Sequence, residues 1–241
     1  MADPFLIDDI LNEFDPTLVN KKNAPKRSLS EELVTAMLNE RMAPELLPYK
    51  HTLMDLVLQQ ISSQQQYLLD SHEYGDSNGD TGMLSADFKL QLMIIETDIE
   101  RLSYLVRLYL RIRLMKIDDF TIFYINETAE ESQMPSNETL LSTEEKDYMQ
   151  KHFKILTQLY NNSFLKKLPD YLTLLDDESA GISMITKPDL NVPVFIRVKS
   201  TKPIYIPLGD DEELELIENG IYVVKYKLIK KYLELGDVEL I

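Results

Sequence analysis

Apolar side chains recur at steps of three and four along residues 90–117, a stretch that contains neither proline nor glycine. This spacing places one apolar stripe along an α-helix. At 1.5 Å per residue the helix would be about 42 Å long, so we expect it to be the central element of a helical domain. The stripe comprises Ile95, Ile99, Leu102, Val106, Tyr109 and Ile112.

The C-terminal half of this helix carries more apolar residues than one stripe can hold. Two further sets spread around the helix, which predicts burial on more than one side. Several neighbours are needed to cover them, within the chain or outside it. The sets are Leu105, Leu108 and Met115, and Leu110, Leu114 and Ile117.

Charged residues in the same helix are ordered, with acids such as Asp98 early and arginines from Arg101 onward. Two interpretations are open. Negative charge near the start of a helix and positive charge near its end complement the helix dipole, and Asp98 could pair with Arg101. Alternatively, the forked guanidinium groups pair with acids of another subunit.

Further helices are predicted on both sides of this element, and together they define an all-α domain over residues 30–170. A serine followed by acids opens a helix at the start of this range. A second helix is expected from about Pro48 to Leu69, followed by a polar, glycine-containing loop over residues 71–82. A capping box, Ser142 to Glu145, predicts another helix over residues 142–168.

The pattern changes after residue 170. Residues 171–187 are interpreted as a linker, and residues 188–241 alternate between apolar and polar positions, which predicts a small β-rich domain. Asn219-Gly220 lies between two alternating runs and is a strong signal for a β-hairpin. The fold class is therefore α+β, with an N-terminal all-α domain followed by a small C-terminal β-rich domain. The expected strands are 194–199, 204–206, 214–217, 221–226 and 238–241, with a short helix over 227–233.

Residues 1–29 are interpreted as an extension outside both domains. Within it, apolar residues at near-helical spacing alternate with acids, and Pro4 and Pro16 flank the unit. So short a helix is not stable alone in water. We therefore favour a docking motif that folds into the groove of a partner, while a helix docked on the chain's own domain is the alternative. The apolar residues are Phe5, Leu6, Ile10, Leu11 and Phe14.

Composition excludes several classes of protein. The 241-residue chain has no cysteine and three histidines, which rules out cysteine-based zinc sites, redox dithiols and thiol nucleophiles. A formal charge of −16 argues against strong autonomous nucleic-acid binding. No apolar run is long enough to span a membrane and no secretory leader is recognisable, so we expect an intracellular protein.

Catalytic patterns are also missing from the sequence. It contains no phosphate-binding glycine loop, no nucleophile elbow and no pair of histidines four residues apart. We therefore expect no enzymatic activity, no cofactor and no metal site. On its residues the chain is a two-domain interaction protein. The alternatives to a subunit of a larger assembly are a stand-alone intracellular adaptor that uses the N-terminal motif, or a lyase-like enzyme that uses paired carboxylates.

Four blocks of sequence carry a resemblance to a known family. In chain order, from Ser30 to the last residue, they resemble the Sld-five subunit of the GINS complex. Four separate blocks in register are more specific than any one of them. The blocks are Asn39–Leu47, Leu110–Ile117, Pro188–Leu190 with Val194–Val198, and Val238–Ile241.

The resemblance implies a eukaryotic, nuclear assembly of four paralogous subunits, each with a helical domain and a small β domain. GINS joins the MCM ring and its companion activator to form the active replicative helicase, and hydrolyses no ATP itself. Three paralogous subunits are thus expected partners, and the later half of the long helix is expected to contact one of them. The expected subunit-interface residues are Leu105, Leu108, Arg111, Arg113, Leu114, Met115 and Ile117.

The N-terminal motif is similar to a short acidic box by which replisome proteins dock on a trimeric hub that links the helicase to polymerase alpha. This resemblance implies the hub as a further partner. It also implies the docking residues, which are Asp8, Asp9, Ile10, Leu11 and Phe14.

Overall fold

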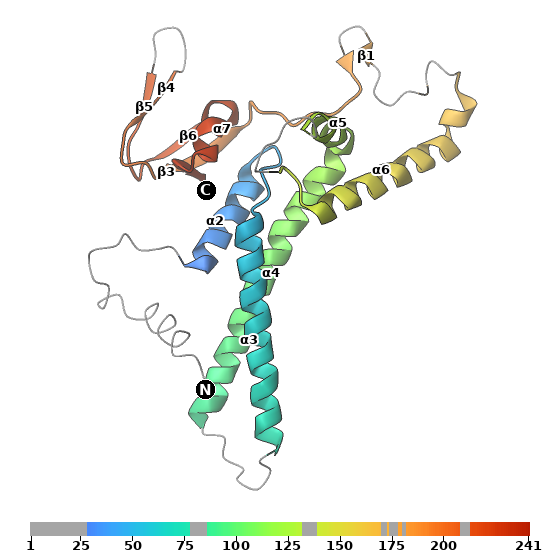
Figure 1. Cartoon of the computed structure of the whole chain (residues 1–241). Coiled ribbons are helices and arrows are strands. Elements are labelled where there is room, and N and C mark those ends of the chain that lie inside the picture. The colour runs from blue at the N-terminus through green and yellow to red at the C-terminus, as the bar shows by residue number, and fades with distance from the viewer. Residues whose placement is uncertain are drawn as a thin grey trace.

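The computed structural model describes residues 28–77, 86–131, 139–169, 173, 178–179, 182–207 and 213–241. Long helices come first and short strands follow, which confirms the α+β class with the helical part at the N-terminal side (Figure 1). The helices of the first part are α2 (Leu29–Met42), α3 (His51–Ser77), α4 (Ala86–Asp119), α5 (Thr121–Glu131) and α6 (Thr143–Ser163), followed by the short 3-10 helix η1 (Leu165–Lys167).

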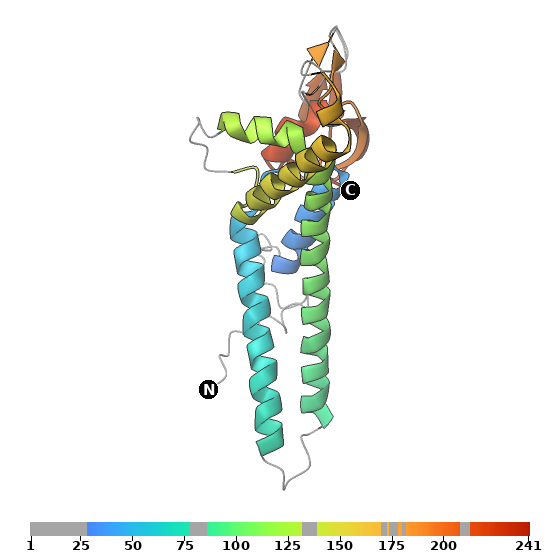
Figure 2. The ribbon, with the colours of Figure 1, turned by 90° about the vertical axis from the view of Figure 1, so that its right-hand side faces the viewer.

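Helix α4 is the central element of the helical part, as its apolar stripe predicts. It has 34 residues and extends beyond the predicted range at both ends. Helix α3 runs antiparallel beside it in both views, and α2 packs against the two near their upper end (Figures 1 and 2). The predicted stripe lies in their shared core, whose fully buried members are Leu33, Met37, Met54, Val57, Ile61, Ile99, Val106 and Tyr109.

Two details of the helical part differ from the prediction. Helix α3 continues through Gly75 to Ser77, because a single interior glycine costs a helix only about 1 kcal/mol. Helix α5 was not predicted, and it forms because Tyr124 packs into a second core with Phe120 and Phe123.

Helix starts follow the predicted capping chemistry. The Ser28 hydroxyl accepts a hydrogen bond from the Glu31 backbone N–H at 3.3 Å and begins α2. At α6 the capping box is complete, since the Ser142 hydroxyl accepts from the Glu145 N–H at 3.1 Å and the Glu145 carboxylate accepts from the Ser142 N–H at 3.0 Å. These contacts satisfy backbone donors that the first turn of a helix leaves open.

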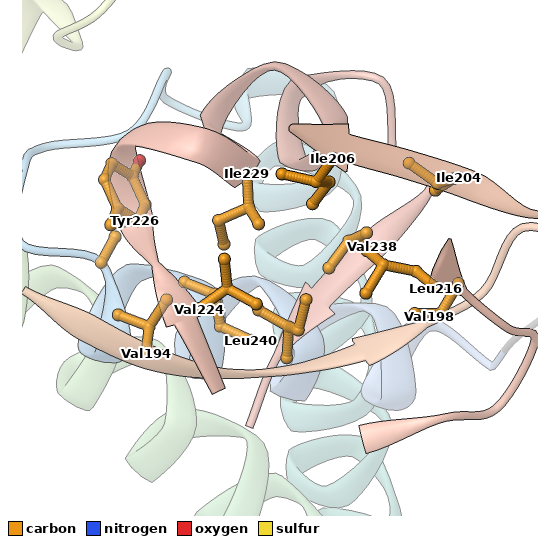
Figure 3. Packing of buried hydrophobic residues seen from close by; sticks show 12 residues of the cluster. Val194, Val198, Ile204, Ile206, Leu216, Val224, Tyr226, Ile229, Val238 and Leu240 are labelled. Carbon is orange, nitrogen blue, oxygen red and sulfur yellow. The ribbon is translucent and has the colours of Figure 1, made fainter. Parts of the chain in front are cut away.

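The C-terminal part is a small antiparallel β structure closed by one helix. Strand β3 lies at the centre of a three-stranded sheet in the order β6-β3-β7, and β4 pairs with β5 apart from it. Helix α7 and the β4–β5 pair cover the inner face of this sheet (Figure 3). The strands and helix are β3 (Pro193–Val198), β4 (Ile204–Pro207), β5 (Glu213–Leu216), β6 (Ile221–Lys225), α7 (Tyr226–Glu234) and β7 (Val238–Leu240), preceded by the two-residue strands β1 (Glu178–Ser179) and β2 (Ile182–Ser183).

The predicted hairpin at Asn219-Gly220 is wrong in its pairing. The turn exists, with Asn219 at a φ of 59°, but β5 pairs with β4 and β6 pairs with β3. The turn residues bond to β3 instead, where the Asn219 N–H donates to the Val198 carbonyl at 2.9 Å. Folding β4 and β5 over the sheet lets Ile206 and Leu216 bury against its inner face, which a flat hairpin would not achieve.

The β part packs directly on the end of α2 and the segment that follows it. The Leu240 N–H donates to the Asn39 side-chain oxygen at 2.8 Å. Ala43, just after α2, is buried within the β core, and Met42 and Leu47 pack against it. The end of α2 and the segment between α2 and α3 therefore hold the helical part and the β part together.

Candidate functional site: a buried charge network and exposed helical faces

Arg113 of α4 lies at the centre of a network of buried charges. Its side chain has 0% exposure, and all five of its guanidinium N–H groups have acceptors. Nε and Nη2 donate to the two oxygens of Glu145 at 2.7 and 2.9 Å. Nη1 donates to Glu40 Oε2 at 3.0 Å and to the Leu47 carbonyl at 2.6 Å, and Nη2 also donates to the Leu140 carbonyl at 2.8 Å.

The two carboxylates of this network connect three helices. Glu145 caps α6 and at the same time forms a bidentate pair with Arg113 on α4. Glu40 of α2 pairs with Arg113 through one oxygen and with Lys116 through the other, at 2.8 Å. Charge-assisted and bidentate hydrogen bonds are the strong ones in proteins. Helices α2, α4 and α6 are thus fixed to one another through a single side chain.

Burial and charge act in opposite directions on the two cations. Burial lowers the pKa of Arg113, but the hydrogen bond to Glu145 and the charges of both carboxylates outweigh it, so this pKa is raised. Burial lowers the pKa of Lys116, and the charge of Glu40 offsets only part of that effect. Arg113 therefore remains charged inside the protein. The rings of Tyr49 and Tyr109 add to its stabilisation, with centroids 5.1 and 5.6 Å from the guanidinium carbon.

The network continues from the helices into the β part. The Lys116 ammonium donates to the Glu45 carbonyl at 2.7 Å. The Glu45 side chain in turn accepts from the Tyr226 hydroxyl at 2.8 Å and from the Lys230 ammonium at 2.9 Å. Tyr226 begins α7, so the buried charges reach from α6 through α4 and α2 to the β part.

The structure divides the predicted subunit-interface residues into three groups. Arg113 and Ile117 have 0% exposure and contact their own chain, so neither presents surface to another subunit. Arg111 and Met115 are exposed on α4. Leu105, Leu108 and Leu114 are half-buried and pack against the cores of the helical part.

A signal for the burial of Arg113 is present in the sequence. Arg113 follows Val106 by seven residues and Tyr109 by four, which places it on the buried stripe of α4. The pattern of charges along the helix suggested either intrahelical pairing or a subunit contact. The structure shows a third arrangement, in which Arg113 pairs with acids of two other helices in the same chain.

Large exposed apolar side chains occupy faces of the helices, including some that the sequence did not single out. Many lie on α3 and along α4, and they include Tyr104 and Met115 in the later half of α4, where the excess was expected. Others lie on α6, a helix that extends away from α3 and α4 in Figure 1. The exposed residues are Leu56, Leu58, Tyr67 and Leu69 on α3, Leu90, Met93, Ile94, Tyr104 and Met115 on α4, and Ile155 and Leu159 on α6.

The polar cluster at the junction of α4, α5 and α6 lacks the geometry of a catalytic triad. His152 Nδ1 lies 3.1 Å from the Thr121 hydroxyl and 3.4 Å from Asp118. A triad needs the hydroxyl and the carboxylate on opposite ring nitrogens, whereas here both face the same one. Among the described residues no group of three or more His, Cys, Asp or Glu is arranged to hold a metal ion.

The predicted docking residues Asp8, Asp9, Ile10, Leu11 and Phe14 lie outside the described residues. Within the described part of the chain, no helix is both long and apolar enough to cross a membrane.

Comparison with known proteins identifies the family. A family model described as the GINS complex protein helical bundle domain matches residues 28–164, and one described as the C-terminus of the DNA replication complex GINS protein SLD5 matches residues 188–241. The helical bundle and the small β domain together thus define a subunit of the GINS type. The chain belongs to the SLD5 family of DNA replication complex GINS proteins.

Relatives extend over nearly the whole chain. A protein of Debaryomyces hansenii named DNA replication complex GINS protein SLD5 is 66% identical, and the match covers 98% of each chain. Its namesake in Saccharomyces cerevisiae is 34% identical over 90% of this chain and 82% of its own. The Schizosaccharomyces pombe protein is 29% identical over 88% of this chain and 91% of its own.

Replacing Arg113 should destabilise the protein strongly. Arg113→Ala leaves Glu40 and Glu145 buried without their partner, and we expect a loss of about 3–5 kcal/mol in the free energy of unfolding. Arg111→Ala, an exposed change two residues away, should alter it by less than about 0.5 kcal/mol. Urea denaturation followed by circular dichroism measures both. Equal stabilities of the two variants would contradict the importance of the network.

Tyr109 should make stability fall at alkaline pH. Burial raises the pKa of Tyr109 to about 12, whereas in the unfolded chain the phenol has its ordinary pKa of 10.0. Its contribution is therefore complete below pH 10 and is lost as the pH rises towards 12, by on the order of 2–3 kcal/mol. Tyr109→Phe should show a correspondingly shallower fall in urea denaturation between pH 9 and 12.

The control for this measurement is Tyr104→Phe, on the exposed side of the same helix. It should reproduce the pH dependence of the unchanged protein, because its phenol is in contact with water in both states. If Tyr109→Phe and Tyr104→Phe gave the same curve, burial of Tyr109 would not be the source of the alkaline loss.

Proposed function

We propose that this chain is a non-catalytic structural subunit of a heterotetrameric GINS complex in the nucleus. In this role it assembles with three paralogous subunits, and the complex associates with the MCM ring and its companion activator in the replicative helicase. The observation that carries the proposal is the extent of exposed apolar surface on α3, α4 and α6 of a chain that belongs to the SLD5 family. Contiguous exposed apolar surface is typical of protein–protein interfaces.

The internal network supports this role because it makes the helical part a rigid frame. Arg113 and Glu145 fix the start of α6 against α4, so the apolar stripe of Ile155 and Leu159 projects at a set angle. Exposed apolar residues along a helix suit the packing of another helix against it. We assign α3, α4 and α6 to contacts with paralogous subunits.

The residues first expected at the interface then have two roles. Arg111 and Met115 are exposed and are proposed to contact a neighbouring subunit, with half-buried Leu105, Leu108 and Leu114 beside them. Arg113 and Ile117 act from inside by holding α4 in place. In this proposal an interface of apolar side chains provides most of the binding energy, as is usual for obligate assemblies.

The overall charge suits a protein partner better than DNA. A formal charge of −16 repels phosphate, so strong autonomous binding to nucleic acid is not part of the proposal. Acidic surface can instead be matched by basic surface on the helicase ring or its activator, which speeds association and favours the correct partner.

The N-terminal motif is proposed to dock on the trimeric replisome hub. Ile10, Leu11 and Phe14 supply the apolar side of a short helix, and Asp8 and Asp9 supply the acidic side. The stand-alone adaptor remains the second candidate function. It would use the same motif without the paralogous subunits.

Assembly should fail when the exposed helical surface is made charged. Leu90→Asp with Met93→Asp changes two exposed residues of α4 and should leave the fold intact. After co-expression with the three paralogues we expect no equimolar four-chain particle on size-exclusion chromatography with multi-angle light scattering, because burying two carboxylates at an interface is unfavourable. Gln91→Asp, an exposed polar position between them, is the control and should assemble.

The result also separates the two candidate functions. A subunit expressed alone should self-associate or be insoluble, whereas an adaptor would be a stable monomer whose behaviour the paralogues do not change. A monodisperse monomer that ignores co-expressed paralogues would overturn the proposal.

The docking motif can be tested with a peptide of residues 1–18. Ile10→Ala with Leu11→Ala should abolish its binding to the trimeric hub in fluorescence anisotropy, because two apolar anchors are lost, at a cost of about 2–4 kcal/mol. Asn12→Ala leaves the apolar side unchanged and is the control. Equal binding by both variant peptides would refute the assignment.

A further inference from the structure

The outward face of the three-stranded sheet carries an apolar patch. Phe195 of β3 and Val223 of β6 are directly paired, and Ile221 lies next along β6 on the same side. Their side chains are 53%, 56% and 60% exposed, whereas the alternate residues of β3 are buried in the core. We call Phe195, Ile221 and Val223 the outer patch. A patch of this kind on a small sheet marks an interaction site.

Basic side chains surround the outer patch. Arg197 is paired with Ile221 across the strands, and Lys225 extends β6 beyond Val223. Among the residues that β3, β6 and β7 place on this face, the acid is Glu239 of β7, which forms ion pairs with Arg197, at 3.4 Å, and with Lys199. Of the charged side chains that these strands and the adjoining Lys199 place on this face, three are cations and one is a carboxylate, in a chain with a formal charge of −16. The outer patch therefore favours an apolar occupant that is acidic.

This charge argues against a second copy of the same face as the occupant. Two outer patches brought together would oppose Arg197 and Lys225 to their own copies, and like charges at an interface are unfavourable. The chain itself contains a segment of the required chemistry. Residues 3–15 combine six apolar side chains with acids and have no basic residue. The apolar residues are Phe5, Leu6, Ile7, Ile10, Leu11 and Phe14, and the acids are Asp3, Asp8, Asp9, Glu13 and Asp15.

The length of chain between residues 3–15 and the three-stranded sheet also permits a contact between them. Helix α2 contacts β7 through Asn39 and Leu240, and Ser28 begins the same helix. Eleven residues of helix separate Ser28 from Asn39, which corresponds to about 16 Å. The intervening residues 16–27 can span up to about 40 Å when extended. Residues 3–15 can therefore reach the sheet of their own chain.

We propose that the N-terminal segment, residues 3–15, docks on the outer patch of its own chain. Its apolar side covers Phe195, Ile221 and Val223, and its acids face Arg197 and Lys225. Because the same apolar side would enter the groove of any external partner, the two contacts exclude each other. The outer patch then acts as an internal competitor that lowers the fraction of segment available to a partner. The proposed docking of residues 3–15 on the sheet does not depend on the identity of the external partner.

Photo-crosslinking in the full-length chain tests the docking. A benzoyl-phenylalanine at Val223 is introduced into the chain, which is purified together with the paralogous subunits or, if these do not assemble, on its own. We expect the dominant crosslink, mapped by mass spectrometry, to fall within residues 3–15. Mixing isotopically light and heavy preparations identifies the chain of origin, and the crosslink should join residues of the same chain.

Charge reversal supplies the matched comparison. Lys225→Glu should reduce the yield of this crosslink about fivefold, the effect of losing an attraction and adding a repulsion at the surface. Lys154→Glu makes the same change at an exposed site on α6 and should leave the yield unchanged. A crosslink to another subunit, to a second copy or to no part of residues 3–15 would overturn the proposal, as would equal yields in the two variants.

Discussion

The buried guanidinium of Arg113 is the interaction on which the arrangement of the helices depends. A buried ion pair contributes little net stability, because removing two charges from water costs nearly as much as their attraction returns. Its effect is instead on geometry. All five N–H groups of Arg113 have acceptors, and these come from α2, from α6 and from the segments that follow α2 and precede α6. Any shift of one segment leaves a donor or a carboxylate buried without a partner, which is unfavourable by several kcal/mol.

The same constraint extends to the β part through acids of neighbouring segments. Glu40 accepts from Arg113 and Lys116, and Lys116 reaches the backbone of Glu45, whose side chain accepts from Tyr226 and Lys230. Each of these carboxylates joins its own segment to one other element: Glu40 joins α2 to α4, and Glu45 joins the segment after α2 to α7. Glu145 shows most clearly how one residue serves two purposes, since its oxygens complete the cap of α6 while holding Arg113. The orientation of the β part on α2 is therefore linked to that of α6 on α4.

Local chemistry made much of this fold predictable, and long-range pairing accounts for what was missed. The apolar stripe of α4 and the capping box at Ser142 depend on residues three or four positions apart, so the sequence displays them directly. The partners of Arg113 are 73 and 32 residues away, and no local pattern connects them. The turn at Asn219 was recognised, but not that β5 would leave it to pair with β4, because alternation identifies a strand without identifying its neighbour. The exposed faces of α3 and α6 were missed for a related reason, since burial depends on which helices are present to provide it.

Placing the arginine inside changes how the outer surface of the helices can be used. Had Arg113 faced outward, Glu40 and Glu145 would be buried without this cation, and the contacts that fix α2 and α6 against α4 would be lost. With Arg113 paired inside the chain, the packing of α2, α4 and α6 needs no acid from a neighbour, and exposed side chains such as Met93, Ile155 and Leu159 remain available. Specific charge pairing thus fixes the helices to one another inside the chain, while exposed apolar side chains on α3, α4 and α6 are available to neighbours. Non-directional apolar contacts tolerate small differences in register, so a rigid charged interior is what can give such an apolar surface a defined shape.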